Sequence, residues 1–191
     1  MEWECPCAIT DKTKGIFSIN MIQDLEIFES SKHTDTRGEF IRFFDEKIMD
    51  LKNKKIQQIN ISRNPHIHTL RGLHFQVGKE SEHKVLYLNH GAIFLAIIDL
   101  RKNSTSYLEK YEVTLDSKEH KSIYIPAGCA TGWMSLKQNT EIIYLMCDRY
   151  EDCTYSGLRY DDPSLDISWP AKPKVISEKD LNWEFLEIKK C

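Results

Sequence analysis

The sequence predicts an all-β protein, an antiparallel double-sheet jelly roll with short peripheral helices. Short apolar runs, alternating or continuous, recur through most of the 191 residues, and turn-forming residues separate them. Short strands at such spacing are typical of a sandwich or a barrel. Only residues 177–186 and a short stretch at 47–54 show helical signals. A single domain fits this length, because a chain of this size encloses one core.

The predicted elements begin after an N-terminal extension. Residues 1–20 are polar and irregular, and residues 21–191 form the predicted domain. Strands are expected at 21–28, 39–44 and 57–62, with a turn at 35–38 and a short helix at 47–54. The Asn64-Pro65 pair ends the third of these strands, because such a pair favours a turn.

The next segment, Leu-Arg-Gly-Leu-His-Phe-Gln at 70–76, is a strand that carries a cation and an imidazole. Gly72 within it indicates a bulge or a close approach of another backbone. Arms at 84–88 and 92–100, separated by Asn89-His90-Gly91, predict a hairpin. The second arm is almost entirely apolar, so we expect it to be buried on both faces.

The last strands are expected at 107–115, 122–125, 132–136 and 140–147. A terminal helix begins at Ser177, because acidic residues in its first turn favour a helix start. The resulting roll is of the cupin kind, and the mouth of such a roll is a usual place for a ligand.

Composition and charge exclude several classes of function. Hydrophobic residues make up 41% of the chain and charged residues 29%, as in ordinary globular proteins. No apolar run approaches the roughly 18 residues of a membrane helix. The amino terminus lacks the basic start and apolar core of a secretory signal, so a cytoplasmic protein is expected. A net charge of −3 without a basic cluster argues against nucleic-acid binding.

The cysteines do not indicate a disulfide scaffold or a metal site. Six are scattered through the chain, and we expect them to be reduced. The Cys5-Pro6-Cys7 run is one residue short of a Cys-x-x-Cys pair, and no second pair follows.

Arg71 and His74 are the first candidates for chemistry. They are three residues apart, so regular strand alternation would place them on opposite faces. Only a bulge or a turn at Gly72 would let both side chains serve one cavity.

The segment 70–76 is part of a wider pattern that resembles the dTDP-4-dehydrorhamnose 3,5-epimerase family over about residues 21–183. The order and spacing of several short motifs carry the resemblance: Asp35-Thr36-Arg37-Gly38, Gln58 with Asn60, Ile125-Pro126 with Gly128, Tyr144, Asp161-Asp162-Pro163, Trp169-Pro170 and Ser177-Glu178-Lys179-Asp180. Such enzymes invert carbons of a nucleotide-linked 4-keto-6-deoxy hexose by proton transfer through an enolate. The resemblance implies a homodimer, no cofactor and no metal.

The resemblance also implies roles for four catalytic residues. His74 is the general base, and Asp180 fixes its tautomer and supports the imidazolium. Tyr144 is the acid on the opposite face of the sugar ring, and Lys84 lies near the enolate oxygen. On the strand at 140–147, Tyr144 shares a face with Ile142.

Further residues are expected to hold the substrate. Arg71 grips the diphosphate together with Arg37 of the partner subunit, which a strand exchanged between the subunits delivers. Gln58 and Asn60 lie two apart on one strand face and add hydrogen bonds in the cavity. The pathway implied by the family is that of deoxysugars for a bacterial surface polysaccharide.

Departures from the family pattern lie around the sugar and the nucleobase. The run Cys129-Ala130-Thr131-Gly132-Trp133 stands where the family has Phe-Ala-His-Gly-Phe, so Thr131 replaces a histidine. Arg149 stands where the family has a tyrosine. These two changes bear on whether C3, C5 or both are inverted.

The second group of departures follows Arg37. Ile41 stands where the family has an aromatic residue, and Arg42 where it has a glutamate that helps to hold thymine. Losing an aromatic ring weakens base stacking, and Arg42 donates where a glutamate accepts. A nucleotide other than dTDP, with CDP as the candidate, is therefore expected.

Two alternatives compete with the epimerase. A metal-dependent cupin is suggested by His66-Ile67-His68, whose alternate residues share a face if they lie on a strand. A cupin that binds a sugar nucleotide without catalysis is the other. The joint presence of His74, Asp180, Tyr144 and Lys84 argues against it, because proton transfer needs a base and an acid.

Overall fold

The structure is a computed structural model that describes residues 22–49, 51–77, 82–148 and 154–187. The predicted N-terminal extension, the Cys5-Pro6-Cys7 run and Arg149 lie outside the described residues. No helix in the described part of the chain is long and apolar enough to cross a bilayer.

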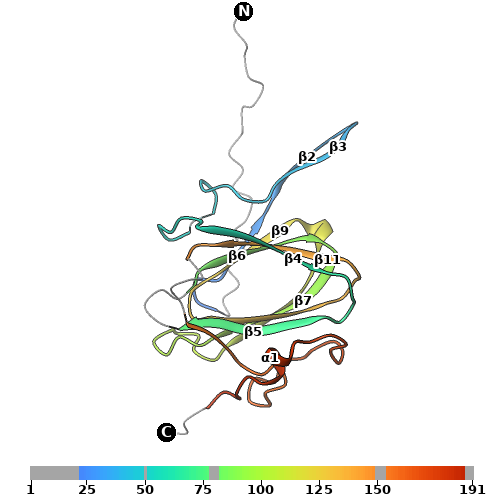
Figure 1. Ribbon diagram of the computed structural model, residues 1–191. Coiled ribbons are helices and arrows are strands. Elements are labelled where there is room, and N and C mark those ends of the chain that lie inside the picture. Colours follow the sequence, from blue (N-terminus) through green and yellow to red (C-terminus); the bar gives the residue numbers. More distant parts are fainter. Residues whose placement is uncertain (1–21, 50, 78–81, 149–153, 188–191) are drawn as a thin grey trace, which may run out of the picture.

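Two five-stranded antiparallel sheets face each other, as Figure 1 shows. The first has the order β1-β9-β6-β11-β4, formed by Glu26–Glu29, Lys121–Ile125, Lys84–His90, Thr140–Met146 and Gln58–Asn64. The second has the order β12-β5-β10-β7-β8, formed by Thr154–Gly157, Leu70–Val77, Cys129–Ser135, Ala92–Asp99 and Lys110–Asp116. The predicted cupin-like jelly roll is confirmed.

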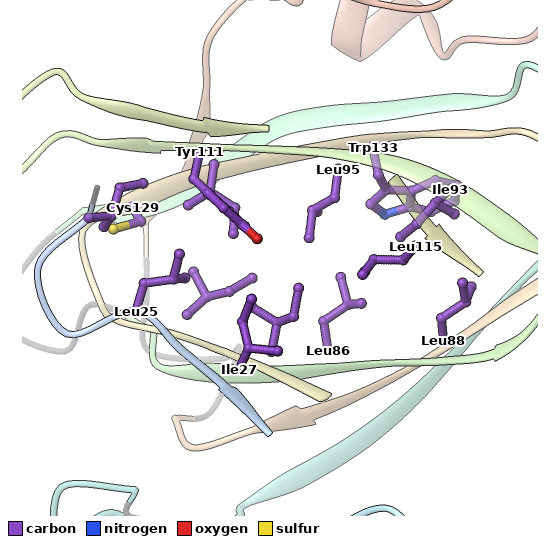
Figure 2. Packing of buried hydrophobic residues seen from close by; sticks show 14 of the residues in the cluster. Leu25, Ile27, Leu86, Leu88, Ile93, Leu95, Tyr111, Leu115, Cys129 and Trp133 are labelled. Carbon is purple, nitrogen blue, oxygen red and sulfur yellow. The ribbon is translucent and has the colours of Figure 1, made fainter. Parts of the chain in front are cut away.

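Apolar side chains from both sheets fill the space between them (Figure 2). Leu86 and Ile142 come from the first sheet, and Leu95 and Ile97 come from the second, all of them fully buried. Burying an aliphatic side chain of this size contributes roughly 1.5–3 kcal/mol. This packing fixes the distance between the sheets, and with it the spacing of polar side chains on their inner faces.

The C-terminal segment covers the outer face of the second sheet. Leu158 and Leu165 pack there against Leu73, Ile98 and Ala130. The segment, drawn in orange and red in Figure 1, carries the one-turn helix α1, Glu178–Leu181, beside β5. A stretch from the end of the sequence is thereby held against the strand that carries His74.

A two-stranded hairpin projects from the roll (Figure 1). It consists of β2, Ser31–Asp35, and β3, Gly38–Arg42. Phe40 on this hairpin is 66% exposed. The turn at 35–38 is confirmed, whereas the sequence did not predict β2.

The hairpin predicted between 84–88 and 92–100 is wrong, although both arms are strands. β6 pairs with β9 and β11, whereas β7 pairs with β8 and β10 in the other sheet. At Gly91 the chain crosses between the sheets with a φ of +90°, and a Cβ there would lie 2.5 Å from Thr140 Oγ1. The second arm is nearly all buried, as expected.

The helix expected at 47–54 is also wrong. Its described residues form turns, and Lys52 and Asn53 have φ values of +53° and +64°. Two successive left-handed residues cannot continue a right-handed helix. The strand expected at 107–115 begins only at Lys110, and the terminal helix is shorter than expected, with Ser177 as its N-cap and Asn182 as its C-cap.

Candidate active site

A bulge at Gly72 brings Arg71 and His74 to the same face of β5. Trp133 is paired with Arg71 and Thr131 with His74, so that Gly132 alone stands opposite two residues of β5. Gly72 has a φ of +130°, and a Cβ on it would lie 2.3 Å from Gly132 Cα. The predicted bulge is therefore present, and only glycine fits its conformation and its space.

His74 is hydrogen-bonded to a buried carboxylate. Its Nε2 lies 2.7 Å from Asp180 Oδ1, across 106 residues of sequence. The Gly72 N–H donates to Asp180 Oδ2 at 3.3 Å, and Trp183 Nε1 donates to Oδ1 at 3.3 Å. Burial favours a raised pKa for Asp180, but the hydrogen bond and charge of His74, with these two N–H groups, outweigh it and hold the pKa below its usual value.

Asp180 reaches this position because the C-terminal segment runs along the part of β5 with which β12 does not pair. Leu158 and Leu73 exchange two backbone hydrogen bonds, at 2.9 and 3.1 Å. The backbone N–H of Leu70 donates to the carbonyl of Val175 at 2.8 Å. Ser177 Oγ then accepts from the backbone N–H of Asp180 at 3.1 Å and starts α1. Between these backbone contacts, the Asp180 carboxylate accepts a hydrogen bond from the backbone N–H of Gly72.

Aromatic rings surround the imidazole. The Tyr155 ring centroid lies 5.1 Å from that of His74, and the Trp183 centroid lies 6.5 Å from it. Lys179 Nζ lies 4.8 Å from the Tyr155 ring centroid and 5.2 Å from the Trp183 centroid. Sequence reasoning missed both rings. Trp183 follows Asp180 by three residues, a spacing that places two side chains on one helix face and could have indicated it, whereas Tyr155 lies on β12, which was not predicted.

Tyr144 points into the interior from the sheet opposite His74. It packs against the interior cluster with Ile142, as the predicted alternation requires. Trp133 Nε1 donates to the Tyr144 hydroxyl at 2.7 Å. Burial raises the pKa of Tyr144 to about 12, although the Trp133 hydrogen bond acts in the other direction. The sequence identified Tyr144 but gave no sign of its partner.

Thr131 lies directly beside His74 on β10. Its hydroxyl is buried and has no hydrogen-bond partner among the described residues. A buried hydroxyl without a partner is costly, because it has lost its hydrogen bonds to water.

Lys84 points inward from β6. It is the register partner of Met146 and shares its strand face with Leu86. Its Nζ lies 3.9 Å from Glu82 Oε1, and both side chains are buried. Glu82 was not identified from the sequence.

Polar residues of β4 extend the same inner surface. Gln58 and Asn60 are the register partners of Met146 and Tyr144, and Gln58 Nε2 donates to Asn60 Oδ1 at 3.2 Å. Arg71 Nε donates to Asn64 Oδ1 at 3.0 Å. The structure thus brings these predicted binding residues to the inner faces that carry His74 and Tyr144.

Two predicted binding residues lie on the projecting hairpin instead. The Arg37 side chain is 88% exposed at the turn and pairs with Asp35 at 2.6 Å. Residues 33–35 and 37–40 line a shallow hollow of about 470 Å³ on this hairpin. Arg42 forms an ion pair with Asp45, with Nη1 lying 3.7 Å from Oδ2. Within this chain, neither arginine joins the inner surface around His74.

His66 and His68 do not lie on a strand. They occupy the turn between β4 and β5, and His68 has a φ of +59°. The premise that their side chains share a strand face is therefore wrong. Among the described residues, no group of three or more His, Cys, Asp or Glu side chains is arranged to hold a metal ion.

A carboxylate-bound imidazole and an indole-bound phenol lie on facing sheets of this cupin-like roll. The family model described as dTDP-4-dehydrorhamnose 3,5-epimerase matches residues 20–187. The chain belongs to this family and is an isomerase of nucleotide sugars.

Relatives and solved structures agree with this assignment. The dTDP-4-dehydrorhamnose 3,5-epimerase of Methanothermobacter thermautotrophicus is 34% identical over 162 residues, which cover 83% of this chain and 87% of the relative. The crystal structure of the epimerase from Bacillus anthracis, with TDP and PPi bound, matches with a TM-score of 0.84 and 28% identity, covering 90% of this chain and 99% of that one. The Legionella pneumophila enzyme, in complex with dTDP-4-keto-L-rhamnose, matches with a TM-score of 0.77 and 28% identity, covering 84% and 87%.

Proposed function

We propose that this protein inverts C3, C5 or both of a nucleotide-linked 4-keto-6-deoxy hexose, by removing a proton and returning one through an enolate. The observation that carries the proposal is the 2.7 Å contact between His74 Nε2 and the buried Asp180 carboxylate. A carboxylate only accepts hydrogen bonds, so an ionised Asp180 holds the proton of neutral His74 on Nε2. The other ring nitrogen, Nδ1, is then the basic one.

The 4-keto group makes the protons on C3 and C5 acidic. His74 removes one of these protons, and Asp180 stabilises the imidazolium that forms. Lys84 supports the negative charge on the enolate oxygen, because a fixed cation in a buried site interacts strongly with developing charge. Each acid or base step contributes roughly 10²- to 10⁴-fold in rate.

Tyr144 returns a proton to the opposite face of the sugar ring. The location of His74 on β5 and Tyr144 on β11, in the two facing sheets, supports this division. A sugar held between them meets a base on one side and an acid on the other. Thr131, with its unsatisfied hydroxyl beside His74, contacts the sugar and influences which carbons are inverted.

The diphosphate is held by Arg71 and by Arg37 of the partner subunit in a homodimer. Three features support the dimer. Arg37 lies at the tip of a projecting hairpin, Phe40 is 66% exposed on the same hairpin, and Ile59 is 62% exposed on the edge strand β4. A hairpin exchanged between subunits buries such surface and delivers Arg37 to the second site.

The nucleotide is dTDP or CDP. The names of the relatives favour dTDP. Ile41 and Arg42 favour CDP, because they replace residues that suit thymine. The surface polysaccharide pathway and the cytoplasmic location remain predictions from the sequence.

Proton exchange in deuterated water tests the proposal. The protein is incubated with 4-keto-6-deoxyglucose carried on dTDP, CDP or GDP, and the C3 and C5 proton signals are followed by NMR. We expect loss of at least one signal and formation of an inverted sugar, and the nucleotide that gives the highest kcat/KM identifies the base. An absence of exchange with all three sugar nucleotides would contradict the proposed function.

A further inference from the structure

We infer that Trp133 is a positioning residue, whose indole N–H sets the Tyr144 hydroxyl as the proton donor. This inference rests on the proposed function, because it concerns the acid step of that reaction. It is carried by the 2.7 Å hydrogen bond from Trp133 Nε1 to the Tyr144 hydroxyl.

The direction of this hydrogen bond is unambiguous. An indole nitrogen donates and has no lone pair with which to accept, so the phenolic oxygen of Tyr144 must be the acceptor. The hydrogen of the phenol is therefore not used in this contact and remains available to a ligand. A hydroxyl in place of the indole could donate or accept, so the direction would be open. A carboxylate in its place would accept the phenolic hydrogen.

Trp133 is held rigidly enough to impose this geometry. It is 2% exposed, and its backbone lies between β5 and β7, where it is paired with Arg71 and Leu95. Figure 2 shows its ring at the edge of the interior cluster rather than at the centre. The hydrogen bond crosses from β10 to β11, so it also ties the two sheets together at the acid.

The same hydrogen bond assists the proton transfer itself. The Tyr144 O–H bond breaks, the electron pair of the enolate forms the new C–H bond, and a phenolate remains. The Trp133 N–H then donates to a full negative charge, and such hydrogen bonds are stronger than neutral ones. Water restores the phenolic proton after the product leaves, and the proton on His74 returns to solvent.

Comparing exchange with inversion separates this role from a structural one. In deuterated water, His74 alone washes out the substrate proton by returning deuterium to the same face, whereas inversion requires Tyr144. In Trp133→Phe, which keeps an aromatic ring and removes the donor, we expect exchange within about threefold of wild type. Inversion should fall ~10- to 100-fold, the range for a hydrogen bond to a charged group.

Two controls accompany this variant. Trp169→Phe removes another indole N–H, which donates at 2.8 Å to the backbone carbonyl of Tyr160, and should change neither rate. In a Tyr144→Phe background, adding Trp133→Phe should have no further effect, because the acid it positions is already gone. If Trp133→Phe lowers exchange and inversion by the same factor, leaves both unchanged, or slows the Tyr144→Phe enzyme further, the inference is wrong.

A measurement on the free protein covers the case in which Trp133→Phe does not fold. The indole N–H resonances of ¹⁵N-labelled wild type and Tyr144→Phe are compared by NMR. Loss of the acceptor should move the Trp133 resonance upfield and leave the other tryptophans in place, and an unmoved resonance would overturn the inference. A wild type that exchanges no proton on any sugar nucleotide would refute the proposed function and this inference with it, whereas normal inversion by Trp133→Phe would refute this inference alone.

Discussion

Single hydrogen bonds determine where protons reside in this site. Asp180 accepts from His74, Gly72 and Trp183, which keeps it ionised and fixes the imidazole proton on Nε2. The resemblance implied both members of the His74–Asp180 pair, because each lies in one of the short motifs that carry it. It did not predict Trp183 as a donor, because that contact depends on how the chain folds back after the one-turn helix α1.

Replacing Asp180 by asparagine tests the support that the carboxylate gives to the imidazolium. Asp180→Asn keeps the shape and removes the charge, so kcat should fall roughly 10²- to 10⁴-fold. Asp166→Asn is the matched control, because that side chain is 97% exposed. Steady-state rates and thermal melting of both variants check this, and a loss of less than threefold in Asp180→Asn would remove the carboxylate from the mechanism.

At the scale of secondary-structure elements, most strands were predicted from the sequence, but their partners were not. Apolar alternation identifies a strand and its buried face, because both follow from local periodicity. The mistaken pairing of β6 with β7 shows the limit. A glycine-containing connection permits a hairpin or a crossing between sheets, and only the packing of the whole roll distinguishes the two. The bulge at Gly72 is the element-level feature that the site requires.

Gly72→Ala should destabilise the protein more than Gly38→Ala. Both glycines have a φ near +130°, at +130° and +129°, but a Cβ meets Gly132 Cα at 2.3 Å in the first and nothing within 4 Å in the second. Each substitution introduces backbone strain of about 1–3 kcal/mol, because alanine disfavours this φ. Only Gly72→Ala also forces the backbone of β10 to move. Urea unfolding should show a difference of about 2 kcal/mol or more. Equal losses would mean that the contact between β5 and β10 is looser than described.

The loop after β7 should make stability depend on pH. Asp99 is fully buried and accepts hydrogen bonds from Arg101, Ser104 and Ser106 at 2.6–2.9 Å. Burial favours a raised pKa, but these hydrogen bonds outweigh it and lower the pKa of Asp99 to about 2.

Because the pKa of Asp99 is lower in the folded state than the ~3.9 of an unfolded chain, its stabilisation is present above pH ~4 and is lost as the pH falls towards 2. The contribution is roughly 2–3 kcal/mol. Denaturant unfolding at a series of pH values should show this loss in wild type and not in Asp99→Asn. Parallel pH curves for the two proteins would contradict the assignment.

For the whole molecule, the described chain presents one set of inner-face residues and a hairpin that points away from them (Figure 1). The family motif predicted Arg37 as a binding residue, and the structure places it at the turn of the projecting hairpin, away from His74. A substrate site shared between subunits leads to a prediction that a monomeric site does not make.

Mixing two impaired variants should restore activity at low substrate concentration. Arg37→Ala should raise KM, and His74→Ala should abolish turnover. After equal amounts are unfolded and refolded together, half of the dimers are mixed, and each mixed dimer has one site with both residues intact, so about a quarter of all sites should be active. Rates at low substrate concentration, with light scattering for the mass, check this. A monomer, or a mixture no more active than its components, would exclude a shared site.

The most direct test of the central claim is whether proton removal from the sugar depends on His74. Wild type, His74→Asn and Tyr144→Phe are incubated in deuterated water with the best of the sugar nucleotides, and exchange and inversion are followed in the same NMR samples. We predict exchange with inversion in wild type, exchange without inversion in Tyr144→Phe, and neither in His74→Asn. Exchange at the wild-type rate in a folded His74→Asn would show that another group is the base.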